Sequence, residues 1–484
     1  MPLASLRILA FINGIFLITL ALSMLVPVVT LLIFEQPQKI NAFLWSSLIT
    51  ALVGIAMIAQ GRPKQTQLRP RDMYMLTVSS WVMVSIFAAL PFMFAERASI
   101  TDAYFESMSG ITATGATVFS GLDDMSPGTL IWRSLLHWLG GIGFIGMAVA
   151  ILPILRIGGM RLFQTESSDR SEKVMPRSHM VAKYMVLAYV GLSTFAVLAF
   201  WLAGMGVFDA INHAMSAIAT GGFSTSDASL GKWQQPAVHW VAIVVMVLGS
   251  LPFVLYVSTL RGNYRALIRD AQVRGFLLLL VGSWFVLAGW KWLTTDLYWL
   301  DALRLVAVNI TSIMSTTGFA VGDYHLWGPF ASMMFFYLGF VGGCSGSTAG
   351  GLKIFRFQVA YILLKANLKQ LIHPRAVIKQ QYNHHRLDED IVRSILAFAF
   401  FYTITIATLA LAVAMCGVDW ITALTGAAAM VSGVGPGMGE MVGPAGNYAT
   451  IPDTAKWLLS LGMLLGRLEI LTVLVLLFPA FWRH

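Results

Sequence analysis

The chain has 484 residues, of which 57% are hydrophobic and only 11% are charged, and its formal net charge is +9. Soluble domains carry roughly 25% charged residues, so the composition excludes a soluble globular protein and predicts an integral membrane protein. The basic excess does not indicate a nucleic-acid partner, because most Lys and Arg residues lie in connections on one side of the apolar stretches.

Ten stretches are long and apolar enough to cross a bilayer. They cover about 8–34, 41–60, 73–95, 134–155, 184–204, 237–260, 275–290, 328–352, 394–416 and 457–481. The first resembles a signal peptide, but its length and the absence of a small-residue cleavage site favour a retained span. Four alternate connections are rich in Lys and Arg, namely 61–72, 156–183, 261–274 and 353–393. The positive-inside rule therefore places these connections and both termini in the cytoplasm.

Four Thr/Ser/Gly-rich breaks lie between these spans, each after an apolar stretch of half the membrane thickness. They are Thr112, Ala113, Thr114 and Gly115; Ile218, Ala219, Thr220 and Gly221; Ser315, Thr316, Thr317 and Gly318; and Ser432, Gly433, Val434 and Gly435. The closing glycines recur about every 100 residues, which is long enough for a span, a re-entrant segment and a second span. Irregular backbone at membrane depth is tolerated where it lines a watery path. The breaks therefore predict one ion pore.

The predicted fold is an all-α polytopic membrane protein. Four pseudo-symmetric repeats of span, pore helix and span surround one central pore, and two extra transmembrane helices precede them. The expected boundaries are 1–65 for the two N-terminal helices and 66–175, 176–268, 269–385 and 386–484 for the four repeats. Small residues also serve helix packing, so a single break would carry little weight, but four in register favour the pore.

Each re-entrant segment begins near an aspartate, and we expect these residues to cap short helices. They are Asp102, Asp209, Asp301 and Asp419. A short helix that ends near the bilayer centre directs its negative carbonyl end toward the pore axis, which favours a cation there. The following Gly-containing segment can present backbone carbonyls to a dehydrated ion, as potassium filters do.

The eighth span contains a glycine-rich break that predicts an intramembrane loop, because each glycine costs about 0.8–1.0 kcal/mol against alanine in a helix. We expect a gate built from Gly343, Gly346, Ser347, Thr348 and Gly350. Arg467 lies within the tenth span, where a charge is expensive and by default functional, and the loop carbonyls are its expected acceptors. A helix-packing seam for the loop and a structural bond for Arg467 remain the alternatives.

These residues resemble the TrkH/TrkG/KtrB potassium transporters of bacteria, which are related to the fungal Trk and plant HKT proteins. The most specific segments are Ser109–Thr117, Gly342–Gly351, Gly435–Glu440 and Gly466–Ile470. The similarity extends from about residue 8 to the C-terminus, and the two extra N-terminal spans are closer to TrkH and TrkG than to KtrB.

The resemblance implies a selectivity filter with one glycine from each pore loop. The matching residues are Gly115, Gly221, Gly318 and Gly435, and Gly115 in place of serine points to potassium rather than sodium. Ala113 replaces a usual threonine, and Ser432 with Gly433 replaces a usual asparagine pair. The resemblance also implies a loop that gates conduction below the filter, with the matching arginine beside it.

The same resemblance implies the partners and the location. They are a TrkA-like cytosolic nucleotide-binding regulatory subunit, a second copy in a homodimer with one pore per subunit, and the lipid of the bacterial inner membrane. Potassium is the expected substrate, and no cofactor is expected in this chain. A carrier that couples potassium to protons or sodium is the alternative function. A membrane-embedded enzyme is a remote one, because the sequence lacks His-Glu-x-x-His, Gly-x-Ser-x-Gly and Walker motifs.

Overall fold

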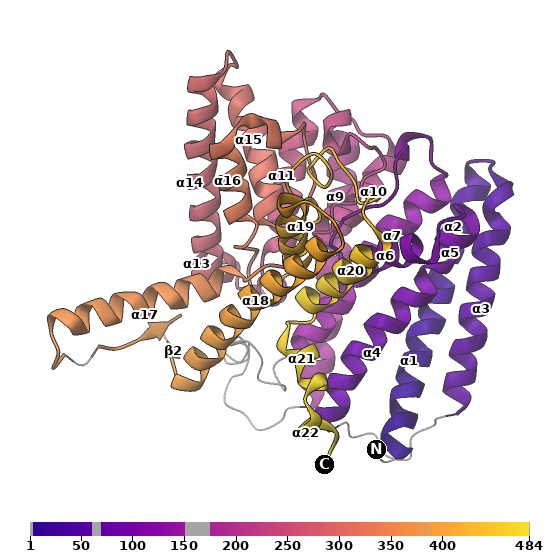
Figure 1. The fold of residues 1–484 in the computed structure, drawn as a ribbon, viewed down its shortest axis with the longest axis horizontal. Helices are drawn as coiled ribbons and strands as arrows, with labels where there is room; N and C mark the ends of the chain where they lie inside the picture. The colour runs from indigo at the N-terminus through magenta and orange to yellow at the C-terminus, as the bar shows by residue number, and fades with distance from the viewer. Residues whose placement is uncertain (1–2, 61–68, 151–174, 377, 384, 484) are drawn as a thin grey trace.

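The computed structural model describes residues 3–60, 69–150, 175–376, 378–383 and 385–483. Within these ranges the chain is almost entirely α-helical, and most of the longer helices run side by side (Figure 1). The two ends of the described chain lie at the same end of the bundle. The N-terminal hairpin consists of α1 (Leu3–Ser23), α2 (Leu25–Ile33), the short turn η1 (Pro37–Lys39) and α3 (Ile40–Ala59).

Four short helices mark the four repeats. They are α6 (Ile100–Thr112), α10 (Val207–Ile218), α15 (Trp299–Met314) and α19 (Trp420–Ser432). In the first repeat α6 is preceded by α4 (Pro70–Ala88) and α5 (Leu90–Ala95) and followed by η2 (Leu122–Asp124) and α7 (Pro127–Ala150). In the second, α10 lies between α9 (Met175–Leu202) and η4 (Ser229–Lys232), α11 (Pro236–Ser250) and α12 (Phe253–Leu260).

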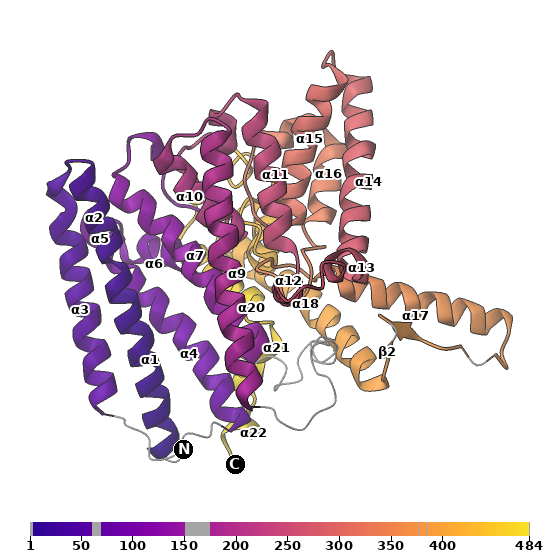
Figure 2. The same ribbon diagram turned by 180° about the vertical axis from the view of Figure 1, so that it is seen from behind.

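The third and fourth repeats follow the same order. The short α13 (Ala266–Arg269) links the second repeat to the third. In the third, α14 (Ala271–Thr294) precedes α15, and η5 (Tyr324–Trp327), α16 (Pro329–Leu338) and α17 (Ile354–Ile372) follow it. In the fourth, α18 (Glu389–Met415) precedes α19, and α20 (Asp453–Arg467), α21 (Leu471–Leu477) and α22 (Pro479–Trp482) follow it. Between them, β1 (Gln381–Tyr382) pairs antiparallel with β2 (His385–Arg386) beside α17, which extends sideways from the bundle (Figure 2).

Six of the predicted spans are continuous helical segments of sufficient length and hydropathy. They are Leu6–Ile33, Pro37–Ala59, Arg71–Ala95, Ala182–Leu202, Ala271–Thr294 and Glu389–Met415. The seventh predicted span, 275–290, is thus longer than expected. The fourth lies in α7, and its last residues, 151–155, fall outside the described part of the chain. The predicted eighth span is α16 followed by an irregular segment, as its glycines indicate.

The sixth and tenth predicted spans are both sharply broken. The helices α11 and α12 meet at 92°, and α20 and α21 meet at 115°. Pro252 explains the first break, because the residue before a proline avoids the helical conformation and Leu251 is extended. At the second break Glu469 has a positive φ of 58°, which ends the helix.

The aspartates of the short helices cap them less uniformly than predicted. Only Asp419 acts as an N-cap, accepting the Thr422 N–H at 3.0 Å. Ser99 is the N-cap of α6, where it exchanges hydrogen bonds with Asp102. Like Asp102, Asp209 and Asp301 lie in the first turn rather than at the cap. A carboxylate in the first turn still interacts favourably with the positive end of the helix, so these three aspartates stabilise their helices without capping them.

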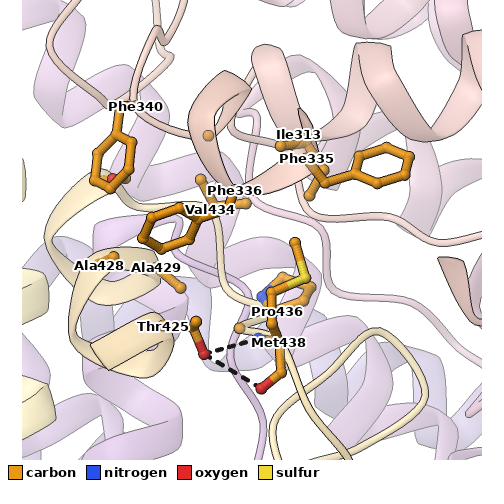
Figure 3. Close-up of a pocket in the computed structure, with 13 residues that line it drawn as sticks. Ile313, Phe335, Phe336, Phe340, Thr425, Ala428, Ala429, Val434, Pro436 and Met438 are labelled. Atoms are coloured by element: carbon orange, nitrogen blue, oxygen red, sulfur yellow. Dashed lines mark hydrogen bonds between the residues drawn. The ribbon is translucent and has the colours of Figure 1, made fainter. Parts of the chain in front are cut away.

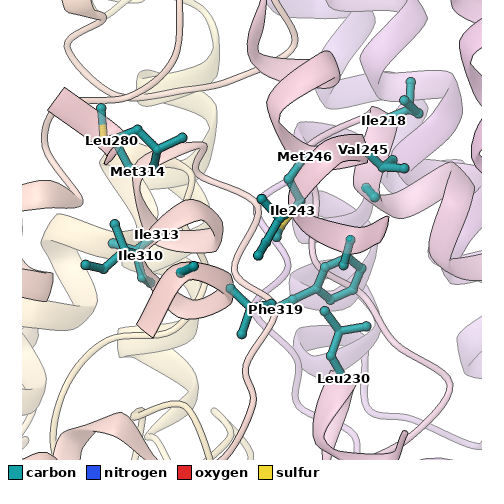
Figure 4. Packing of buried hydrophobic residues seen from close by; sticks show 14 of the residues in the cluster. Ile218, Leu230, Ile243, Val245, Met246, Leu280, Ile310, Ile313, Met314 and Phe319 are labelled. Atoms are coloured by element: carbon teal, nitrogen blue, oxygen red, sulfur yellow. The ribbon is translucent and has the colours of Figure 1, made fainter. Parts of the chain in front are cut away.

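A large apolar core supports the short helices of the second and third repeats (Figure 4). Ile218 at the end of α10 and Ile310 on α15 are completely buried, as is Met246 on α11. Phe319, directly after the third break, is buried in the same cluster. Because protein interiors are close-packed, this core fixes the positions at which the short helices end.

Candidate functional site

The four short helices end in the same backbone conformation. A residue in the left-handed region follows each helix, and a glycine with positive φ comes two residues later. The first residues are Ala113 (φ 53°), Thr220 (52°), Thr316 (57°) and Gly433 (69°), and the glycines are Gly115 (84°), Gly222 (88°), Gly318 (87°) and Gly435 (92°). Between them, the N–H groups of Thr114, Gly221, Thr317 and Val434 bond helix carbonyls at 2.8–2.9 Å. The structure therefore repeats one local motif four times.

These four segments close a ring. A methyl group on Gly115 would overlap the carbonyl oxygen of Gly221, and one on Gly222 would overlap that of Thr317. One on Gly318 would meet the carbonyl of Val434, and one on Gly435 that of Thr114. Each glycine thus faces the carbonyl that precedes the glycine of the next repeat. We call these four glycines and four carbonyls the glycine ring.

The ring corrects the sequence prediction in the second repeat. The motif begins at Ala219 and its ring glycine is Gly222, so the expected set Ile218, Ala219, Thr220 and Gly221 is shifted by one residue. Two consecutive glycines made the register ambiguous in the sequence. The distance from the preceding aspartate does not resolve it, because this distance is 13 residues to Gly115 and to Gly222 but 17 to Gly318 and 16 to Gly435. The other three predicted sets coincide with the motif.

Buried hydroxyl groups brace the ring segments from within. Thr112 and Thr114 share a hydrogen bond of 2.8 Å, and Ser315 and Thr317 share one of 2.7 Å. Ser432 bonds the hydroxyl of Tyr402 on α18 at 2.7 Å. Because these hydroxyls bond each other or a neighbouring helix, they hold the backbone conformation that places the ring carbonyls.

The irregular segment 339–353, which we call the loop, lies against the ring segments of three repeats. The Gly351 N–H donates to the Ser432 carbonyl at 2.8 Å, and the Gly350 N–H donates to Thr316 Oγ1 at 2.7 Å. Thr348 Oγ1 donates to the Ile218 carbonyl at 2.9 Å and lies 3.3 Å from Thr220 Oγ1. The loop therefore contacts the carbonyl ends of the short helices.

Arg467 makes the loop contact that its position predicted. Its Nη1 donates to the Thr348 carbonyl at 2.7 Å, and its guanidinium carbon lies 4.2 Å from the centre of the Phe144 ring. Within the described residues, Nε and Nη2 of Arg467 have no hydrogen-bond partner. Glu469 does not pair with Arg467 but with Arg356 on α17, at 2.7 Å. The break after α20 thus directs one charge toward the loop and the other toward α17.

Residues 39–483 match the family model TrkH, described as a cation transport protein. The chain belongs to this family. It is 48% identical to the Trk system potassium uptake protein TrkI of Halomonas elongata over 96% of this chain and 95% of that one. It is 34% identical to TrkH of Escherichia coli, with 99% of each chain covered. The crystal structure of the potassium transporter TrkH from Vibrio parahaemolyticus matches all of both chains with a TM-score of 0.92 and 32% identity.

Membership of this family makes the chain a cation transport protein of the membrane and not an enzyme. The close match to a solved TrkH structure agrees with the predicted all-α fold. On the face of the ring away from the loop, this Trk-family protein has a hollow lined by all four repeats, which we call the vestibule. Its walls include Gly115, Arg133, Ser224, Gly318, Gly435 and Tyr448.

The vestibule is bordered by an ion pair between neighbouring repeats. Lys232 Nζ lies 2.8 Å from Asp123 Oδ1, and the Ser226 hydroxyl bonds the other oxygen of Asp123. Burial raises the pKa of Asp123, but hydrogen bonds from Lys232 and Ser226 outweigh it and leave the pKa below its ordinary value. The hydrogen bond to Asp123 raises the pKa of Lys232. Asp227 also joins the two repeats, since its carboxylate accepts the N–H groups of Gly121 and Leu122.

Proposed function

We propose that this protein takes up potassium ions and that the glycine ring is its selectivity filter. The observation that supports this most directly is the contribution of one glycine and one facing carbonyl from each of four repeats. Rings of backbone carbonyls replace the water shell of potassium in known filters. Relatives over nearly the whole chain are named as potassium uptake proteins.

The filter then consists of Thr112–Gly115, Ala219–Gly222, Ser315–Gly318 and Ser432–Gly435. The short helices end at these segments, so each adds about half a negative charge from its carbonyl end. Gly115 in the first segment favours potassium over sodium by the resemblance stated above. Gly115 is also sterically required, because a side chain there would overlap the neighbouring carbonyl.

In this proposal the loop is the gate and Arg467 holds it closed. The contacts of Thr348, Gly350 and Gly351 fix the loop against the filter segments. Arg467 adds a charge-assisted hydrogen bond to the Thr348 carbonyl, and such bonds are roughly twice as strong as neutral ones. Conduction then requires these bonds to break and the loop to move aside.

The setting of the protein is part of the same proposal. We place it in the bacterial inner membrane with both termini in the cytoplasm, as the Lys- and Arg-rich connections indicate. We divide it at the boundaries given above into the N-terminal pair of helices and four repeats. A TrkA-like nucleotide-binding subunit docks on the basic connections, and the functional unit is a homodimer.

Ion flux into liposomes tests the filter. We expect wild-type protein to pass potassium and rubidium in preference to sodium, and Gly115→Ser to lose this preference. Gly282→Ser is the matched control, because Gly282 has open space around it in α14. Potassium preference that persists unchanged in Gly115→Ser would refute the ring as the filter. Reversal potentials measured under separate potassium, sodium and proton gradients distinguish a channel from a coupled carrier.

A further inference from the structure

Side chains of the short helices form hydrogen bonds to the backbone that leaves the ring on the side facing the vestibule. Asn309 on α15 bonds both backbone groups of Val321, donating to its carbonyl at 3.0 Å and accepting its N–H at 2.9 Å. In the fourth repeat Thr425 on α19 bonds the N–H and carbonyl of Met438 at 2.9 and 3.2 Å (Figure 3). Val321 and Met438 are each the third residue after a ring glycine. These side chains therefore brace the backbone that leaves the ring.

Repeat 1 makes the corresponding brace with a carboxylate. Glu106 accepts the N–H of Val118, the third residue after Gly115, at 2.9 Å, and also the Thr117 hydroxyl at 2.9 Å. In repeat 2 His213 bonds the Ser224 hydroxyl at 3.0 Å. Glu106, His213 and Asn309 lie the same distance before the left-handed residue that ends their helix. Glutamate, histidine and asparagine thus occupy one position of the repeat, and Glu106 is the only carboxylate there.

Arg133 on α7 compensates that carboxylate inside the protein. Arg133 Nε lies 2.7 Å from Glu106 Oε1, and the two side chains are 1% and 0% exposed. Its other nitrogens reach the segments that leave the ring in two repeats, at Thr117 Oγ1 (3.1 Å) and the Ser224 carbonyl (3.0 Å). The guanidinium also lies 4.1 Å from the centre of the Phe223 ring. One residue thus links the first ring segment to the second.

The same arginine lies where a cation enters. Arg133 lines the vestibule together with ring residues of every repeat. A positive charge in this place repels an incoming cation unless a negative charge lies beside it, and a low-dielectric site strengthens the effect. Glu106 supplies that charge at hydrogen-bonding distance. Loss of Glu106 alone would therefore leave Arg133 as an uncompensated positive charge beside the vestibule.

We propose that Glu106 and Arg133 are positioning residues that hold the ring segments of repeats 1 and 2 in register, and that Glu106 also cancels the field of Arg133 on entering cations. This inference rests on the proposed filter. Two effects are expected. Loss of the hydrogen bonds by which Arg133 joins repeats 1 and 2 lowers selectivity, whereas an uncompensated Arg133 charge lowers flux.

A double-mutant comparison in liposomes tests the pair. Glu106→Gln keeps an acceptor for Val118 but leaves Arg133 unpaired, and we expect potassium flux to fall at least tenfold. Adding Arg133→Met restores neutrality, so flux should recover to within about threefold of wild type, which corresponds to less than about 1 kcal/mol in the barrier. The double variant should still discriminate less between potassium and sodium, because the bridge to Ser224 is gone.

Glu96→Gln is the matched control, because Glu96 forms a 2.7 Å ion pair with Lys39 in contacts that involve neither the ring nor the loop. Thr117→Val removes one hydroxyl from the network and should lower selectivity even if the charge variants fold poorly. Loss of selectivity in Gly115→Ser together with wild-type flux and selectivity in folded Glu106→Gln and Thr117→Val would overturn this inference alone. Unchanged selectivity in Gly115→Ser would overturn the filter and this inference with it.

Discussion

At the scale of single residues, the protein depends on positions where a side chain has no room. The four ring glycines combine positive φ with direct contact to the carbonyl of the next repeat. A non-glycine residue in such a conformation costs on the order of 1–3 kcal/mol before any overlap is counted. These glycines therefore serve the geometry of the ring rather than general flexibility.

The corrected register gives the first residue-scale prediction. Gly222→Ala introduces a methyl group that overlaps the Thr317 carbonyl, so potassium flux should fall at least tenfold and selectivity should decrease. Rubidium uptake into liposomes with competing sodium measures both quantities. Gly289→Ala in α14 is the control, because that site is open. Wild-type uptake by the Gly222 variant would show that Gly222 does not belong to the filter.

Arg467 gives the second residue-scale prediction. Arg467→Ala removes the hydrogen bond to the Thr348 carbonyl, so the loop should open more often and basal flux without any partner should rise several-fold. Single-channel or flux recordings on purified protein measure this rise. Arg393→Ala, which breaks an exposed ion pair with Glu389, should leave flux unchanged. Unchanged basal flux in Arg467→Ala would remove this residue from the proposed gate.

At the scale of elements, broken helices of three repeats meet at the loop. The Cys344 N–H donates to the Ser250 carbonyl at the end of α11, and the Phe253 N–H at the start of α12 donates to the Gly346 carbonyl. Arg467, at the end of α20, holds the Thr348 carbonyl. The breaks leave backbone groups without helical partners, and the loop satisfies several of them. This arrangement explains how irregular backbone persists inside the protein.

A reversible cross-link tests whether the loop must move. The hydroxyl oxygens of Thr220 and Thr348 lie 3.3 Å apart, so Thr220→Cys with Thr348→Cys should form a disulfide under oxidation. We expect the oxidised protein to lose potassium flux and dithiothreitol to restore it. Each single cysteine variant controls for the substitutions themselves. Equal flux in the oxidised and reduced double variant, with the disulfide confirmed by mass spectrometry, would rule out movement of this part of the loop.

At the scale of the whole molecule, neighbouring repeats are joined around the vestibule by polar contacts as well as by the core. The Asp123–Lys232 pair and the Asp227 carboxylate connect repeats 1 and 2, and Lys456 connects repeat 4 to Asp102 of repeat 1 at 2.6 Å. The Asp123–Lys232 pair is exposed, and such pairs contribute about 0–1 kcal/mol. The apolar core therefore provides most of the stability, while these pairs fix how the repeats meet.

The shifted pKa values predict how the first of these pairs depends on pH. Asp123 has a lowered pKa, so its stabilising contribution is present above the unfolded-state value and is lost as the pH falls through the folded-state value. Lys232 has a raised pKa, so its contribution is lost only as the pH rises through that value. Asp123→Asn should lower the melting temperature slightly from about pH 5 to 9, and its effect should fade as the pH falls through the folded-state pKa, which lies below the ordinary value of about 3.9. A difference that persists in strong acid would contradict this assignment.

The sequence by itself determined the membrane class, the number of repeats, three of the four ring segments and the irregular loop. Apolar spans, glycine breaks and unpaired charges are local properties, and the bilayer imposes strong limits on each of them. The contact between Arg467 and a loop carbonyl was predictable for the same reason, since a charge inside a span needs a nearby acceptor.

Only the tertiary structure decided the register of the second ring segment, the caps of three short helices and the breaks in the sixth and tenth spans. It alone brought Glu106, Arg133 and Ser224 together, although they are far apart in the chain. These features depend on which backbone groups and charges meet across repeats. Such pairings are set by packing and by the need of buried polar groups for partners. The sequence marks one of the breaks with Pro252, but it does not say which groups bond the backbone that the break frees.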